Sequence, residues 1–295
     1  MKLMKLLPHF ITLLVMGVFV AGCGDDSTDG PVDITELNPP SGVKVKIYSA
    51  SGTSAQVSWT ESSDEGLSDF KGYVVVTNKV TAAGAKIERA DSAVVLKSES
   101  NFHIVPLDPN RATYYKTVVY AITDDNKKSV SAESIIYAGV YEDITRTIDE
   151  YSATAQSANS GFGWDASTGL GTQYPFSSSN SSKIDLHLKK VGSTLTFYSP
   201  DAATNPSLSG ARTTKIGLVG TGQTAYDRAE NLDEPNMASI AVAVDNVYLI
   251  KTKDNIYVKV WVKKAQAESG HTYQTVTFDF KIQPIAGFRV LKSAI

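Results

Sequence analysis

The sequence predicts an all-β protein made of two β-sandwich domains. Three observations favour this fold class: apolar residues alternate with polar ones in short runs, polar turn residues separate the runs, and little of the chain has the apolar spacing of a helix. Short strands in regular succession are typical of an antiparallel sandwich. About 270 residues follow an apolar N-terminal segment, which is enough for two domains with a core each.

The first 23 residues have the pattern of a bacterial export signal. Lys2 and Lys5 precede an apolar run of 13 residues that ends at Gly22, and this run is shorter than the roughly 20 residues of a membrane-spanning helix. The run closes with Val20-Ala21-Gly22-Cys23, which contains the only cysteine. These residues resemble the lipobox of bacterial lipoproteins. The resemblance implies that residues 1–22 are a signal peptide and that Cys23 is acylated; a signal peptide with an incidental cysteine is the alternative.

Residues 23–37 are expected to be a disordered tether. Asp, Gly, Ser and Pro dominate the segment, and its few aliphatic residues bury too little apolar surface to offset the entropy lost on ordering. Asp25 and Asp26 directly follow the cysteine region, and an anionic membrane surface would repel them. We therefore expect a lipid-anchored protein of the bacterial cell envelope, on the outer membrane or the cell surface, with the membrane face left open.

Residues 38–140 are expected to form the first domain. Turns are expected at Ser51-Gly52-Thr53 and at Asp124-Asp125-Asn126. Five runs with apolar residues at every second position predict its strands: Val43 to Ile47, Ala55 to Trp59, Tyr73 to Val75, Ile104 to Leu107, and Thr117 to Ala121.

Several spaced motifs of this domain resemble a fibronectin type III domain. They are Pro39 to Val43, Val57 to Thr60, Phe70 to Val75, and Leu107-Asp108-Pro109 followed by Tyr115 and Tyr120-Ala121. The resemblance implies a sandwich in which Tyr115 is a corner tyrosine, with its ring in the core and its hydroxyl bonded to nearby backbone. Trp59, Tyr73 and Tyr120 are also expected to face inward, and the domain is interpreted as a spacer.

Residues 141–295 are expected to form a second antiparallel sandwich. Its first segment, Glu142 to Ala158, has apolar spacings of four, three and four that suggest a short helix or a covering segment. A hairpin turn is expected at Thr252 to Asn255. The strand-like runs are Gly161 to Asp165, Ile184 to Leu188, Leu195 to Phe197, Ile216 to Val219, Ile240 to Val244, Val247 to Leu249, Tyr257 to Val262, and Val276 to Ile282.

Parts of this second domain resemble the haem-binding HmuY-like lipoproteins of Bacteroidetes-type bacteria. The matching stretches are Gly161 to Asp165, Lys183 to Leu186 and Tyr248 to Val260. The resemblance implies a shared fold, and in that family haem is held by paired axial histidines. No such pair is matched here. We expect His103 to be an ordinary surface or half-buried residue, His187 to face solvent and His271 to lie in a loop. Because the resemblance implies a shared fold, haem capture is kept as an alternative function.

Composition and motifs narrow the function classes. Without residues 1–22 the chain has 26 basic residues, because 28 less Lys2 and Lys5 leaves 26, against 31 acidic ones. Its formal charge of about −5 and the lack of a basic cluster argue against nucleic-acid binding. Motifs for a metal site, a nucleophile elbow or a phosphate loop are also missing. We therefore expect no enzyme activity, no metal and no cofactor.

The segment from Gly161 to Phe176 carries the candidate ligand-binding residues. Trp164, Tyr174 and Phe176 stand among Gly, Ser and Thr residues, and an aromatic face can stack on a sugar ring while hydroxyls bond its polar groups. The competing interpretation is that Phe162 and Trp164 are alternating core residues. The hypothesis is a lipid-anchored, non-catalytic binding or adhesion protein for a glycan or an envelope protein; an accessory subunit of an envelope complex is a further alternative.

Overall fold

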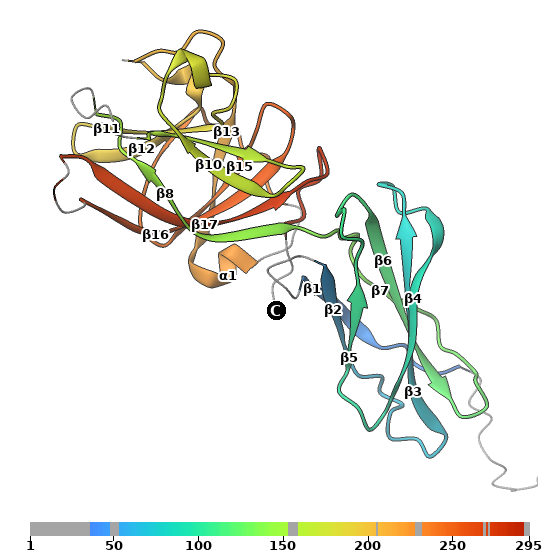
Figure 1. The fold of residues 1–295 in the computed structure, drawn as a ribbon. Coiled ribbons are helices and arrows are strands. Elements are labelled where there is room, and N and C mark those ends of the chain that lie inside the picture. Colours follow the sequence, from blue (N-terminus) through green and yellow to red (C-terminus); the bar gives the residue numbers. More distant parts are fainter. Residues whose placement is uncertain are drawn as a thin grey trace, which may run out of the picture. The chain divides into compact units, whose positions relative to one another are not determined.

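The computed structural model describes residues 36–47, 53–152, 159–204, 206–227, 232–267, 270 and 272–291. The predictions for the signal peptide, for Cys23, for residues 23–35 of the tether, for the turn at Ser51-Gly52, for residues 153–158 and for His271 lie outside these residues. The described chain is almost entirely β-structure, arranged in four antiparallel sheets (Figure 1). The predicted all-β fold with two sandwiches is confirmed.

Two of the sheets are formed by the first seven strands. One has the order β1-β2-β5 and the other the order β4-β3-β6-β7. The strands are β1 (Ser41–Ile47), β2 (Ser54–Thr60), β3 (Phe70–Val80), β4 (Lys86–Leu96), β5 (Phe102–Pro106), β6 (Tyr114–Thr123) and β7 (Ala132–Glu133). The chain thus passes from one sheet to the other after β2, after β4 and after β5, and the two sheets form a fibronectin III-like sandwich.

The inner faces of these two sheets pack into a shared core. One cluster joins β1, β2 and β5 to Tyr115 of β6, and a second joins Trp59 of β2 to Tyr73 of β3. Tyr115 is 2% exposed, and its hydroxyl accepts a hydrogen bond from the backbone N–H of Asp108 at 2.7 Å. The predicted corner tyrosine is confirmed. Leu37, the last residue of the expected tether, also packs into this core.

Tyr120 does not face inward as expected. It lies between Val119 and Ala121, which are fully buried, and it is only half-buried with the ammonium group of Lys128 over its ring at 5.6 Å. Side chains alternate between the faces of a strand, so the buried positions 115, 117, 119 and 121 place position 120 on the outer face.

The other two sheets are formed by the later strands. Their orders are β10-β9-β11-β12-β14 and β13-β15-β16-β17-β8. The strands are β8 (Tyr141–Asp149), β9 (Gly161–Asp165), β10 (Leu170–Tyr174), β11 (Leu186–Val191), β12 (Thr194–Tyr198), β13 (Lys215–Thr221), β14 (Ser239–Ala241), β15 (Asn246–Lys251), β16 (Tyr257–Ala267) and β17 (Gln274–Gln283), with one helix, α1 (Gly222–Asp227), and 3-10 turns at Ser178–Asn180 and Pro200–Ala202.

A single large apolar cluster fills the space between these two sheets. It includes Phe162 of β9, Phe197 of β12 and Phe278 of β17, all at most 1% exposed. The predicted hairpin turn joins β15 to β16: the N–H of Asn255 donates to the carbonyl of Thr252 at 3.0 Å, and Asn255 has a φ of 60°. Asparagine tolerates this left-handed conformation better than most residues.

The helix suggested for Glu142 to Ala158 is wrong over its first part. Residues 141–149 form the edge strand β8, which pairs with β17 so that Ile148 faces Val276 in the core. A register shift and the positive φ of Thr145, 59°, interrupt the strand. This irregularity leaves Ile144 exposed and hides the period of two in the sequence.

The run from Ile240 to Val244 is shorter as a strand than expected, because β14 ends at Ala241. No helix among the residues that the structure describes is long and apolar enough to cross a bilayer.

Candidate ligand-binding site

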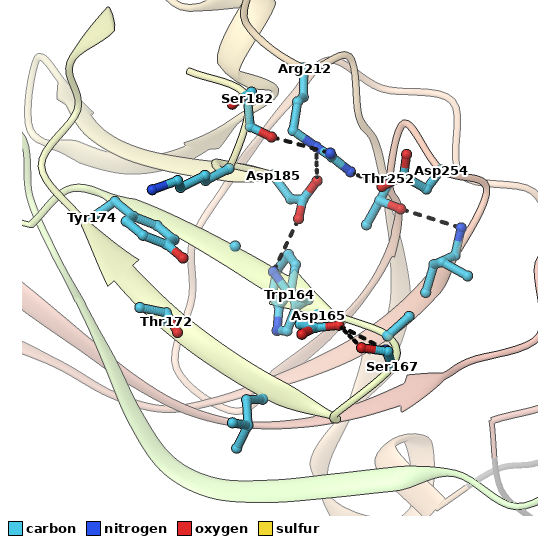
Figure 2. Close-up of a pocket in the computed structure, with 15 residues that line it drawn as sticks. Trp164, Asp165, Ser167, Thr172, Tyr174, Ser182, Asp185, Arg212, Thr252 and Asp254 are labelled. Atoms are coloured by element: carbon cyan, nitrogen blue, oxygen red, sulfur yellow. Dashed lines mark hydrogen bonds and ion pairs between the residues drawn. The ribbon is translucent and has the colours of Figure 1, made fainter. Parts of the chain in front are cut away.

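A cleft of about 450 Å³ opens beside the β9-β10 hairpin (Figure 2). Tyr174 and Thr172 come from β10, while Trp164 and Asp165 come from β9. The opposite wall is formed by Ser182, Lys183 and Asp185 just before β11, by Arg212 before β13, and by Thr252, Asp254 and Ile256 of the β15-β16 turn. The cleft therefore gathers four separate segments of the second sandwich.

The register of the hairpin explains how the first wall is built. Thr172 pairs with Gly163, and Tyr174 pairs with Gly161, so Thr172 and Tyr174 share a face with two residues that have no side chain. A Cβ atom at Gly163 would lie 1.9 Å from the carbonyl oxygen of Lys183. Glycine at this position lets the segment with Lys183 approach the strand and close the cleft.

An ion-pair network holds the opposite wall together. The Nε of Arg212 donates to Asp185 at 2.6 Å, its Nη2 donates to Asp254, and its Nη1 donates to the carbonyl of Ser182 at 3.3 Å. The second carboxylate oxygen of Asp185 accepts the backbone N–H of Trp164 at 3.1 Å. Figure 2 shows this chain of contacts running from Trp164 through Asp185 to Arg212 and Asp254. One guanidinium group thus links the β9 strand to the β15-β16 turn.

The environments of the acidic groups differ. Burial raises the pKa of Asp185, although the charge of Arg212 and the hydrogen bond from Trp164 oppose that rise. Asp165 is exposed at the end of β9, where its Oδ1 accepts the hydroxyl of Ser167 at 2.6 Å and its N–H at 2.8 Å. These hydrogen bonds, the one from the hydroxyl first, lower the pKa of Asp165. Asp165 is therefore an ionised acceptor at neutral pH.

Trp164 belongs to both the cleft and the core. Its ring lies 5.3 Å from that of Phe162 and 6.1 Å from that of Phe280, centroid to centroid. The side chain is half-buried and lines the cleft as well. The core interpretation therefore holds for Phe162, which lies in the core. Trp164 lies between the core and the cleft, so it fits both interpretations.

Phe176, the third candidate, is not among the residues that line the cleft. Its ring stacks on the imidazole of His187 with centroids 3.6 Å apart and planes 17° apart. His187 itself is fully buried, which corrects the expectation that it faces solvent. Strand β11 lies inside its sheet, and Phe176 and Tyr151 cover the face on which His187 lies.

His187 is held as a neutral ring. Its Nδ1 lies 2.9 Å from the carbonyl oxygen of Ser160, and burial lowers its pKa to about 4. His103, in the first sandwich, is half-buried, as expected, and its Nε2 lies 2.7 Å from Asp91. Neither histidine lines the cleft. Within the described ranges no group of three or more His, Cys, Asp or Glu residues is placed to hold a metal ion.

The sequence did not reveal the polar wall. Asp185, Arg212 and Asp254 come from three distant segments, and no motif links them. The one local signal is that Asp185 stands in an otherwise apolar strand run, between Ile184 and Leu186, where a carboxylate needs a partner.

No family model and no curated protein matches this chain. A solved structure titled "Myokine structure" is 20% identical, covers 35% of this chain and 98% of its own, and has a TM-score of 0.27. The third fibronectin III domain of human KIAA0343 protein is 16% identical, with 39% and 93% covered and a TM-score of 0.30. The twitchin kinase region from C. elegans is 8% identical, with 82% and 40% covered and a TM-score of 0.28.

Proposed function

We propose that this protein is a lipid-anchored, non-catalytic binding protein of the bacterial envelope and that its ligand is a glycan. The observation that carries the proposal is the cleft of about 450 Å³, which combines the rings of Trp164 and Tyr174 with the polar groups of Asp165 and Thr172. A concave site with aromatic surface and a few convergent polar groups is the usual form of a small-ligand site. Sugars present both apolar ring faces and hydroxyl groups, and therefore fit this lining.

The chemistry of the carboxylates supports binding without catalysis. Glycoside hydrolysis needs a general acid with a raised pKa that can give its proton to the ligand. The pKa of Asp165 is lowered, so it is a poor proton donor. The pKa of Asp185 is raised, but one of its oxygens accepts Arg212 and the other accepts the N–H of Trp164.

The anchor is supported by the N-terminal sequence. One acyl chain gives only marginal membrane attachment, and two or more give stable anchoring. A mature bacterial lipoprotein carries three acyl chains, so acylation of Cys23 would anchor the protein stably at a membrane surface. The first sandwich would then be a spacer and the second the binding domain. Replacement Cys23→Ser tests this: we expect the protein to move from the membrane fraction to the soluble fraction, and intact mass without added lipid on the native protein would contradict the anchor.

A glycan array tests the ligand. The full-length protein in detergent is applied to the array, together with the variant Tyr174→Ala, because Tyr174 is half-buried and lines the cleft. We expect retention of a defined set of glycans and an affinity at least about tenfold weaker for the variant, which corresponds to ~1.4 kcal/mol.

Tyr120→Ala is the matched control. This tyrosine is also half-buried, but it lies on the outer face of β6 in the first sandwich. The Tyr120→Ala variant should bind the same glycans as the native protein, with the same affinity. An array without retained glycans, or equal losses for the two tyrosine variants, would refute the glycan proposal.

A further inference from the structure

The cleft has an unequal balance of charge. Five residues with acidic or basic side chains line it: three carboxylates, Asp165, Asp185 and Asp254, and two bases, Lys183 and Arg212. The formal sum is −3 + 2 = −1. The position of each group decides which of these charges a ligand meets.

Arg212 has little positive charge to offer a ligand. Its side chain is 16% exposed, and each of its three nitrogens already donates within the wall, to Asp185, Asp254 and Ser182. Two carboxylates already contact this guanidinium group, so its positive charge is balanced within the wall and attracts a further anion only weakly. The strongest base of the cleft therefore serves the structure of its wall.

The accessible acidic groups are Asp165 and Asp254. The side chain of Asp254 is 64% exposed, and Asp165 is also exposed. Both border the cleft, as Figure 2 shows. A carboxylate accepts hydrogen bonds and donates none. Arg212 supplies one positive charge to the two carboxylates of Asp185 and Asp254. Together with Asp165, this part of the cleft therefore keeps an excess of negative charge, which favours hydroxyl or amino groups on a ligand and repels acidic groups.

Lys183 lines the cleft beside Tyr174. Its ammonium group is 5.8 Å from the centroid of the Tyr174 ring, and Figure 2 shows Tyr174 on the side of the cleft away from Asp165 and Asp254. Its charge therefore adjoins the aromatic surface and does not neutralise the end of the cleft where the two carboxylates stand.

We infer that the cleft selects neutral or amino-bearing glycans and rejects those that carry carboxylate groups. This inference rests on the proposed glycan-binding function and specifies its ligand class. The selection acts by repulsion: an acidic sugar would place its charge against Asp165 and Asp254, while the same sugar with a hydroxyl group would donate hydrogen bonds to them.

Matched oligosaccharides provide the test. Oligomers of glucose, mannose and galactose are compared with oligomers of the same length of glucuronic, mannuronic and galacturonic acid, each titrated into the full-length protein by calorimetry. We expect the neutral member of at least one pair to bind, and to bind about tenfold or more tightly than its acidic counterpart. Because the carboxylates are exposed, added salt should narrow that ratio.

Two double variants separate the cleft from the overall charge. Asp165→Asn with Asp254→Asn should bring the acidic member to within about threefold of the neutral one, since the repulsive charges are removed. Asp124→Asn with Asp233→Asn changes the net charge equally, at exposed positions that do not line the cleft, and should preserve the selectivity.

The outcomes are distinct. Acidic oligomers that bind as tightly as neutral ones, or a selectivity that the Asp165 and Asp254 variant leaves unchanged, would overturn the inference while glycan binding stands. If none of the six oligomers and no glycan of the array binds, the proposed function itself fails and the inference with it.

Discussion

The two sandwiches differ in the polar groups that they bury. Among the described residues, the buried polar side chains of the first sandwich are neutral hydroxyls: Ser62, Thr77, Thr117, Thr123, Ser129 and Ser134. The second sandwich buries four residues with acidic or basic side chains, Asp185, His187, Lys259 and Lys281, each at most 1% exposed over the whole residue. Burying a charge is unfavourable unless it is paired, and perturbed ionisable groups gather at functional sites. Of these four residues only Asp185 lines the cleft, so the difference concerns mainly how the second sandwich is stabilised.

Several buried groups of the first sandwich form hydrogen bonds with neutral partners, although the hydroxyls of Tyr73 and Thr123 also donate to the carboxylates of Glu65 and Asp125. The hydroxyl of Tyr73 accepts the N–H of Ser62 at 2.9 Å, and that of Tyr137 lies 2.8 Å from the hydroxyl of Thr117. Thr117 and Thr77, which face each other on β6 and β3, are joined at 2.8 Å. None of the groups in these neutral hydrogen bonds changes charge near neutral pH, so we expect these bonds to depend little on pH.

The second sandwich relies on charged pairs. Lys259 and Lys281 are cross-strand neighbours on β16 and β17, and both contact the end of helix α1. Lys259 donates to the carbonyl of Tyr226 at 3.1 Å, and Lys281 donates to the carboxylate of Asp227 at 2.7 Å. The carbonyl end of a helix carries partial negative charge, which suits two ammonium groups. Because these contacts are buried and charged, we expect the stability of the second sandwich to fall when one of their residues is substituted.

The largest expected effect follows from breaking the buried pair of the cleft. Arg212→Ala removes the charged partner of Asp185, whose side chain is 2% exposed, and leaves a buried carboxylate with only the N–H of Trp164 as a partner from the cleft network. We expect a loss of about 3–5 kcal/mol in the unfolding free energy of the second sandwich. Hydrogen-exchange mass spectrometry locates the effect: protection should fall in β9 and β11 and persist in β2 and β3.

Arg212→Lys serves as the companion variant. Lysine keeps the positive charge but cannot donate from three nitrogens in the fork that contacts Asp185, Asp254 and Ser182. We expect an intermediate loss. Equal protection of the second sandwich in the native protein and in Arg212→Ala would contradict the role given to this network.

The next effect is a dependence on pH. The pKa of His187 falls to about 4 in the folded state, below the ordinary value of about 6.5 in an unfolded chain. Between these values the unfolded chain binds more protons, so the second sandwich should lose stability as the pH falls from about 7 to about 4, by up to about 3 kcal/mol. Denaturant unfolding monitored by hydrogen exchange at several pH values measures this slope.

A non-titrating variant tests the assignment to His187. Glutamine can still donate to the carbonyl of Ser160, which lies 2.9 Å from the histidine Nδ1, but it does not gain a proton in this range. His187→Gln should therefore flatten the slope of the second sandwich between pH 7 and pH 4. His103→Gln, in the first sandwich, should leave that slope as it is; a slope that also survives in His187→Gln would assign the effect to another group.

These tests concern groups that the sequence could only partly predict. The alternating runs predicted most strands, and the motif around Tyr115 predicted both its burial and its backbone bond, because these features depend on neighbours close in sequence. The burial of His187 depends on Phe176 and Tyr151, and alternation within one strand says nothing about what covers its second face. In the same way, Trp164 and Tyr174 were found from a local aromatic pattern, whereas Arg212 and Asp254 reach the cleft only through the fold.

A smaller effect is expected in the first sandwich. Tyr115→Phe removes the hydroxyl that accepts the N–H of Asp108 at 2.7 Å, while the ring keeps its place in the core. One neutral hydrogen bond is worth about 1 kcal/mol, so the unfolding free energy of the first sandwich should fall by about that amount. Glycan binding should stay unchanged; a loss of binding in this variant would mean that the first sandwich takes part in recognition.

The smallest expected effect on stability comes from an exposed ion pair whose length is close to that of the buried one. Arg146 contacts Asp143 at 2.7 Å, almost the distance between Arg212 and Asp185, but the side chain of Arg146 is 43% exposed and that of Asp143 is 20% exposed. Water already solvates such a pair, so Arg146→Ala should change the unfolding free energy by no more than about 0.5 kcal/mol. Both arginines belong to the second sandwich and form pairs of nearly equal length. If the two alanine variants lost similar stability, burial would not be what makes the Asp185 network important, and the contrast between the two sandwiches would have to rest on contact geometry.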